Sequence, residues 1–187
     1  MDNIYYFTKT EVINYCDFFE SNLYKTDQTG KARLLITGID KMLLHEKGIY
    51  LIDSPYERNS ETSIVYYYDF ETQGMKKVME IKNLKSFQIS NEYILYSVGS
   101  YTNVYLYDIV HKTNIFLNKK LGIEFPINDT GIRNGHIYVY QQVGGDEIYK
   151  ILDVNIADFT ITDADKTNLP EYIEMCCDLD CVVQFFY

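Results

Sequence analysis

Cysteine and histidine are the residue types in this 187-residue chain that could bind a metal ion or form a nucleophile–base pair. The four cysteines are Cys16, Cys176, Cys177 and Cys181. Structural zinc usually needs two separated pairs of ligands, and adjacent cysteines are poor tetrahedral ligands. The three histidines fall in different parts of the chain and form no close pair. We therefore expect free thiols, no metal site and no cofactor.

No sequence motif identifies an active site. A Gly-x-Ser-x-Gly elbow is absent. The chain has 27 acidic residues, so carboxylate pairs of the kind used in glycoside hydrolysis can be found without indicating one. The glycine-rich run 143–147 lies between two predicted strands, which favours a hairpin turn over a phosphate-binding loop. We therefore predict that the protein is not an enzyme. The alternative is a carbohydrate-binding or hydrolytic protein with its site in a central channel.

One short phrase recurs along the chain: an aliphatic residue, a tyrosine, two residues and an aspartate. It occupies 23–27, 65–69 and 104–108, and a fourth copy at 148–153 has one extra residue before its aspartate. The four tyrosines, at 24, 66, 105 and 149, are separated by 42, 39 and 44 residues. A period near 42 residues is typical of four-stranded propeller blades. We interpret the aspartates as turn residues that accept backbone N–H bonds, and the tyrosines as packing between repeats.

Each repeat contains further strand signals around the phrase. Short runs rich in Tyr, Ile, Val and Phe alternate with polar turns, and no segment keeps helical spacing over eleven residues. The predicted order is an inner strand, a second strand, a third strand with the phrase, and an outer strand. The only predicted helical turn lies near 10–19. The fold class is therefore all-β and β-propeller-like, with about four four-stranded antiparallel blades in one domain, 1–187. The repeats cover roughly 4–47, 48–91, 92–135 and 136–180.

The sequence starts and stops partway through a predicted blade. The first strand, 4–7, has the character of a second strand, and 171–187 forms a terminal half-blade with predicted strands at 171–175 and 182–186. Three arrangements follow: a closed small ring, an open arc, or an oligomer such as a homodimer that shares blades. An open arc would expose apolar edges and faces, which disfavours it.

The pattern "IYY … LYKTD-x-TGK-x-x-LL" of the first repeat resembles the propeller repeats of uncharacterised bacterial domains. It is distantly similar to the YWTD repeats of lipoprotein-receptor propellers. The chain differs from those in having no tryptophan and only about four and a half repeats. The resemblance implies a scaffold that binds protein or ligand on one face, and it carries no catalytic residues.

Charge narrows the class of partner. Seventeen basic and 27 acidic residues give a net charge of −10, which argues against binding to a nucleic-acid backbone. From 153 to 187 the chain has eight acidic residues and one basic residue. This stretch is either a solvated acidic edge or a surface for a basic protein partner, such as the target of an inhibitor or immunity-like protein.

The chain begins without a basic segment followed by an apolar run, and no window approaches 18 apolar residues. We therefore expect no signal peptide and no membrane partner. Together with the unpaired cysteines, this predicts a cytoplasmic protein with reduced thiols.

Two long connections, 9–22 and 54–63, are the predicted binding loops, because long loops on a rigid scaffold often carry binding residues. The candidate binding residues in these loops and in the acidic stretch are Tyr15, Phe18, Phe19, Tyr56, Arg58, Asp163, Asp165, Glu171 and Glu174. From them we predict a non-enzymatic module that binds another protein.

Overall fold

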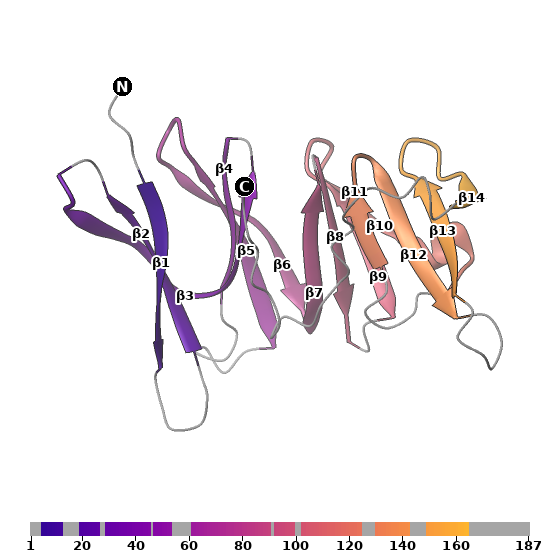
Figure 1. Ribbon diagram of the computed structural model, residues 1–187, viewed down its shortest axis with the longest axis horizontal. Helices are drawn as coiled ribbons and strands as arrows, with labels where there is room; N and C mark the ends of the chain where they lie inside the picture. The colour runs from indigo at the N-terminus through magenta and orange to yellow at the C-terminus, as the bar shows by residue number, and fades with distance from the viewer. Residues whose placement is uncertain are drawn as a thin grey trace. The chain divides into compact units, whose positions relative to one another are not determined.

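The computed structural model describes residues 5–12, 19–26, 29–45, 47–53, 61–90, 92–99, 102–124, 130–142 and 149–164. These residues form fourteen strands and one short helix, so the all-β prediction is confirmed. The strands build three antiparallel sheets, and the chain divides into two compact units, residues 1–82 and 83–187 (Figure 1).

The first unit contains one six-stranded sheet whose strands pair in sequence order. The strands are β1 (Tyr5–Val12), β2 (Phe19–Thr26), β3 (Ala32–His45), β4 (Gly48–Asp53), β5 (Thr62–Asp69) and β6 (Met75–Lys82). The first part of β3 pairs with β2, its last part pairs with β4, and the change of partner falls at Ile39. Gly38, with φ of 69°, allows the strand to bend there. One continuous strand thus supplies the predicted outer strand of the first repeat and the inner strand of the second.

The bend in β3 lets the two ends of this sheet enclose a core. Leu23 of β2 packs with Ile39 of β3, with Ile49 and Leu51 of β4, and with Tyr68 of β5, each no more than 2% exposed. Full burial of a large apolar side chain stabilises a fold by about 1.5–3 kcal/mol. This cluster therefore holds β2 and β3 against β4 and β5.

The opposite face of β4 and β5 carries an aromatic stack. The rings of Tyr50 and Tyr67 lie 4.7 Å apart, and the His45 ring meets both edge-on. The Lys76 ammonium lies 5.1 Å from the centre of the Tyr67 ring, a cation–π distance. Glycine is required at Gly48, because a Cβ there would collide with the backbone oxygen of Tyr68 as well as with the Tyr67 ring.

The second unit contains two four-stranded sheets, and in each the order inner, second, third and outer strand is as predicted. One sheet comprises β7 (Leu84–Ser90), β8 (Tyr93–Val98), β9 (Asn103–Asp108) and β10 (Thr113–Phe116). The other comprises β11 (Thr130–Arg133), β12 (His136–Gln142), β13 (Tyr149–Asn155) and β14 (Ile161–Asp163).

The facing sides of these two sheets share a core. Leu106 of β9, Ile137 and Val139 of β12, and Val154 of β13 are completely buried in it. Leu117, the first residue of helix α1 (Leu117–Leu121), is also completely buried there. The second and third strands of each blade therefore supply the packing between blades, as expected for repeats that stack on their neighbours.

The helix is not where the sequence predicts it. Residues 10–12 continue β1 and Phe19 begins β2, so the predicted helical turn near 10–19 is wrong at both ends. Helix α1 instead follows β10 and ends at Gly122, whose left-handed conformation closes the last turn. Asn118 fixes the helix to the neighbouring chain, since its amide accepts from the Val104 N–H and donates to the Thr102 carbonyl.

The same pairing shortens the first predicted binding loop. Val12 lies opposite Phe19 and Lys9 lies opposite Asn22, so both ends of the connection predicted at 9–22 are strand. The terminal half-blade at 171–187 lies outside the described residues. The choice among ring, arc and shared blades therefore stays a prediction, as does the single domain.

Candidate functional site

The aspartates at the ends of β5 and β9 organise the turns that follow them. Oδ1 of Asp69 accepts bonds from the backbone N–H (2.8 Å) and the hydroxyl (3.0 Å) of Thr72. Oδ1 of Asp108 accepts from the backbone N–H groups of Val110 (2.9 Å) and His111 (2.8 Å). The bonds from Thr72 lower the pKa of Asp69. Partial burial opposes ionisation of Asp108, but the bonds from His111 outweigh it and lower that pKa as well. The predicted turn role is confirmed for both.

In the fourth repeat, the prediction that Asp153 is the turn residue is wrong. Asn155, and not Asp153, lies opposite the first residue of the preceding strand, the position that Asp69 and Asp108 occupy in their sheets. Asn155 also forms the turn, because its Oδ1 accepts the N–H of Ala157 at 2.9 Å. Asp27, the aspartate of the first copy, lies outside the described residues.

The correction also moves the tyrosine position. Tyr66 and Tyr105 lie three residues before the turn residue of their strands, and in the fourth repeat that place belongs to Leu152 and not to Tyr149. Tyr66 packs on the core of the first unit and Leu152 lies in the core of the second. Packing between repeats is therefore confirmed for Tyr66, whereas Tyr105 packs within its own sheet, on the rings of Tyr96 and Phe116.

Asp153 pairs with a histidine across the sheet. Its Oδ1 lies 2.7 Å from Nδ1 of His136. The His136 ring stacks nearly parallel on Tyr138, with ring centres 6.2 Å apart. Burial raises the pKa of Tyr138, the nearby Asp153 carboxylate adds to this, and the charge of Arg133 opposes it. By strand alternation these side chains point away from the shared core, where Ile137 is buried.

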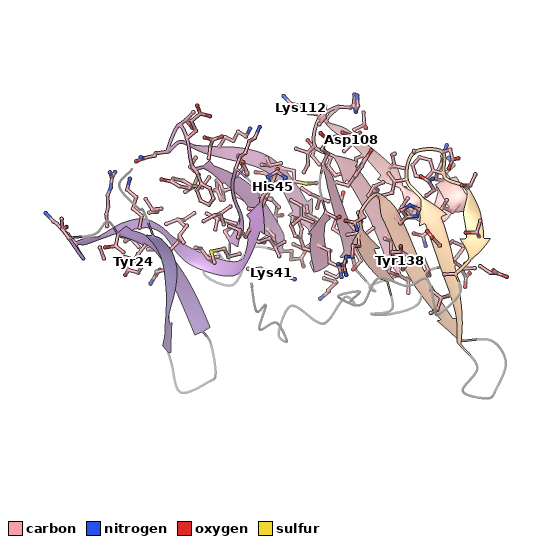
Figure 2. The ribbon with its side chains drawn as sticks, turned by 45° about the horizontal axis from the view of Figure 1, so that its top comes forward. Tyr24, Lys41, His45, Asp108, Lys112 and Tyr138 are labelled. Atoms are coloured by element: carbon pink, nitrogen blue, oxygen red, sulfur yellow. The ribbon has the colours of Figure 1, made fainter. Side chains whose placement is uncertain are left out.

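His136, Tyr138 and Asp153, which we call the His136 cluster, include the histidine and the carboxylate of a catalytic triad but no nucleophile. A carboxylate on Nδ1 fixes the ring and leaves Nε2 as the atom that could exchange a proton. A serine, threonine or cysteine would then have to reach that nitrogen. Within the part of the chain that the structure describes, no hydroxyl or thiol bonds to His136. Figure 2 labels Tyr138 on β12, and it labels Asp108 and Lys112 at the turn after β9.

The buried polar side chains of inner strand β7 form hydrogen bonds to other strands. The Gln88 side chain of β7 extends to β11, where its Oε1 accepts the Ile132 N–H (3.1 Å) and its Nε2 donates to the Thr130 carbonyl (3.5 Å). The hydroxyls of Ser86 and Ser97 bond to each other at 2.6 Å. These buried groups join strands to one another. In the described inner strands, 39–45, 84–90 and 130–133, the only acidic residue is Asp40.

No group of three or more His, Cys, Asp or Glu side chains that could hold a metal ion occurs among the described residues. The cysteines at 16, 176, 177 and 181 lie outside them.

The predicted binding residues fall almost entirely outside the described residues. Those outside are Tyr15, Tyr56, Phe18, Arg58, Asp165, Glu171 and Glu174. Phe19 is the first residue of β2, and Asp163 is exposed at the end of β14. The structure therefore brings none of these residues together, and the loop and tail surfaces stay predictions.

The register reveals a basic pair that the sequence analysis missed. Lys25 of β2 lies directly opposite Arg33 of β3, and Arg33 is exposed. Nζ of Lys25 donates to Oε1 of Gln73 at 2.5 Å, a neutral acceptor from the turn after β5. The two cations are eight residues apart in sequence, so only the pairing of β2 with β3 could have identified them.

Net charge is distributed unevenly along the sequence. From 153 to 187 the chain has eight acidic residues and one basic residue, which accounts for −7 of the net charge of −10. The rest of the chain has 19 acidic and 16 basic residues, so the excess negative charge lies mainly in the C-terminal stretch.

Solved structures resemble this chain in fold. The β-propeller domain of the Trilobed protease from Pyrococcus furiosus matches with a TM-score of 0.56 and 15% identity over 87% of this chain and 54% of its own. The acylaminoacyl peptidase of Pyrococcus horikoshii matches with a TM-score of 0.58 and 14% identity, over 86% of this chain and 30% of its own. TolB from Acinetobacter baumannii matches with a TM-score of 0.44, which is too low to support an argument.

These similarities, with the blade order of the strands, show that the chain has an all-β, β-propeller-like fold. The chain spans about half of the first matched structure and less than a third of the second. No family model and no curated protein matches the sequence. No helix among the described residues is long and apolar enough to cross a membrane.

Proposed function

We propose that this chain is a non-enzymatic module that binds another protein through its long loops and through an acidic C-terminal surface suited to a basic partner. The distribution of charge carries the proposal: residues 153–187 contain eight acidic residues and one basic residue, −7 of the net charge of −10. Complementary charge accelerates association and selects partners. An inhibitor or immunity-like protein in the cytoplasm, acting as a monomer or homodimer, is one member of this class. The resemblance to bacterial repeat domains and to YWTD-type propellers agrees with a binding scaffold.

The use of the inner strands supports binding over catalysis. A channel enzyme would need acidic and polar side chains from several inner strands at once. In the described inner strands, the polar groups of Ser86 and Gln88 are buried in bonds that hold strands together. Asp40 is the only acidic residue there. The His136 cluster likewise has no nucleophile bonded to it among the described residues.

A hydrolytic role remains the second candidate, because the matched structures include a propeller domain of a protease and an acylaminoacyl peptidase. On this hypothesis the chain would be the propeller part of a hydrolase. Incubation of the purified chain with chromogenic ester and peptide substrates tests it. Turnover that His136→Gln abolishes without unfolding the protein would favour the hydrolase over the binding module.

The test of the binding proposal is the affinity for a purified partner, first captured from the native host, measured from about 0.05 to 0.5 M salt. Over this range the screening length falls several-fold, so binding through the acidic stretch should weaken steadily. The variant Glu171→Gln/Glu174→Gln should bind about threefold to tenfold less tightly. The matched control, Glu71→Gln/Glu92→Gln, removes the same charge from exposed turn positions after β5 and before β8. Salt-independent affinity, or equal loss in the control, would contradict the proposal.

A further inference from the structure

The Lys25–Arg33 pair places two positive charges directly opposite each other on antiparallel strands. Residues in direct register have Cβ atoms about 4.5–5.5 Å apart, and like charges at such positions destabilise a sheet. A folded protein keeps such a pair at a cost in stability, unless an anion compensates it. The stability of the sheet therefore does not account for the pair.

The described residues provide no compensating carboxylate. The Lys25 ammonium bonds to the amide oxygen of Gln73, which satisfies one donor but leaves the charge unopposed. Arg33 has no ion pair in the described parts of the chain. Two of the three lysines of β6 behave differently: Lys77 pairs with Glu80 at 2.5 Å and Lys82 with Glu61 at 3.4 Å.

The surroundings of the pair suit an extended acidic segment. The chain is exposed from Lys31, which directly precedes β3, through Leu34, and Lys31 adds a third cation two residues before Arg33. The Arg33 guanidinium offers a planar fork for a carboxylate, and the amide nitrogen of Gln73, whose oxygen bonds to Lys25, supplies a neutral donor. A small anion would meet only exposed, solvated charges here and bind weakly. A segment with several carboxylates would sum several such contacts.

We propose that Lys25, Lys31, Arg33 and Gln73 form a docking site for an extended acidic segment of a separate partner protein. This site lies on β2, β3 and the turn after β5, and it goes beyond the proposed function, which concerns acidic surfaces elsewhere in the chain. At physiological ionic strength charges more than about 8 Å away are largely screened, so the overall charge of −10 does not prevent an acidic segment from binding locally.

A fluorescently labelled deca-glutamate peptide is the probe, titrated with the full chain at low and at physiological salt. Lys25→Gln/Arg33→Gln should weaken binding about fivefold or more. Lys77→Gln/Lys82→Gln removes the same charge from lysines that already have carboxylate partners, and it should leave binding within a factor of two. Equal weakening in both variants, or no measurable binding to the wild type, would overturn the proposal.

Stability measurements test whether a carboxylate of the chain itself compensates the charge of the Lys25–Arg33 pair. Lys25→Gln/Arg33→Gln should unfold at the same or higher urea concentration than the wild type, since it removes repulsion. If it is destabilised, and Asp27→Asn is destabilised equally, the positive charge of the pair is compensated within the chain and the proposal fails.

Two further measurements test the identity of the occupant. A salt-sensitive dimer that is lost in Lys25→Gln/Arg33→Gln would make the occupant a second copy of this chain. Binding of an oligonucleotide as tight as that of the peptide would make it a nucleic acid. Either result overturns the assignment to a protein partner.

Discussion

The two histidine–aspartate pairs of the second unit use the same side chains at almost the same distance, 2.8 Å for Asp108 with His111 and 2.7 Å for Asp153 with His136. They differ in what else the carboxylate does. Asp108 also accepts two backbone N–H bonds and closes the turn after β9, whereas Asp153 lies inside β13 and joins it to β12. The first pair is thus an addition to a turn, and the second is a link across a sheet.

From this difference we expect a carboxylate's contribution to stability to depend on the backbone groups it satisfies more than on the charge it meets. Exposed ion pairs contribute about 0.2–1 kcal/mol. Capping of otherwise unpaired backbone N–H groups contributes about 0.5–2 kcal/mol. The partner histidine should therefore matter less at Asp108 than the turn does.

The largest effect is expected at Asp108. Asp108→Ala removes the acceptor for the N–H groups of Val110 and His111 and should lower the free energy of unfolding by about 1–2 kcal/mol. Urea denaturation followed by circular dichroism measures it. Asp108→Asn keeps an acceptor and should recover most of the loss. If Asn fails to do so, charge and not turn geometry is what Asp108 supplies.

A smaller effect should distinguish the two candidates for the turn residue of the fourth repeat. Asn155→Ala loses the bond to the Ala157 N–H and should destabilise the protein by about 0.5–1 kcal/mol. Asn155→Asp should be nearly neutral, because aspartate fills this position after β5 and β9. Equal destabilisation by Asn155→Asp and Asn155→Ala in the same urea experiment would show that the register correction is wrong.

Asp153→Asn should have a still smaller effect on stability, about 0.5 kcal/mol or less, because the amide can still accept from Nδ1 of His136. Its effect should instead appear on Tyr138. The Asp153 carboxylate helps to raise the pKa of Tyr138, so removing its charge should lower that pKa. Ultraviolet titration against a Tyr138→Phe reference gives the shift. An unchanged tyrosine titration would mean that burial alone sets it.

The smallest effect is the pH dependence of the His111 contact. The hydrogen bond and charge of Asp108 raise the pKa of His111 above its ordinary value of 6.5. A raised pKa means that the folded state holds the proton more tightly, so the contribution is complete below pH 6.5 and disappears as pH rises through the folded pKa. His111→Gln should therefore differ from the wild type near pH 5.5 and match it near pH 9. A difference that persists at pH 9 would contradict this assignment.

The strand order was predictable because its signals are local. Alternation, turn residues and a period near 42 residues each act over a few positions, and together they placed the inner, second, third and outer strands of three sheets. The role of Asp153 was not predictable in the same way. The turn residue lies two positions beyond Asp153, on the same face of β13, and the phrase alone could not show that Asn155 was the turn residue.

Other features depended on contacts distant in sequence. Helix α1 is held by the burial of Leu117 and by bonds from Asn118 to β9 and the segment before it, and its five residues are too few for a periodic signal. The Lys25–Arg33 pair exists only through strand register. Thr37 and Gly38 have the composition of a break between strands, yet β3 continues through them because it has partners on both sides of the bend.

The continuity of β3 has a consequence for engineering and for the history of the repeat. In most repeat proteins the link between units is the place where a unit can be inserted, deleted or permuted. Here the first two repeats have no link, since one strand passes from one to the other and both sets of backbone bonds depend on it. Chain breaks or duplications should be tolerated near Asn83, where a single turn residue joins β6 to β7, more readily than near Gly38. The first two repeats should therefore be gained or lost as a pair.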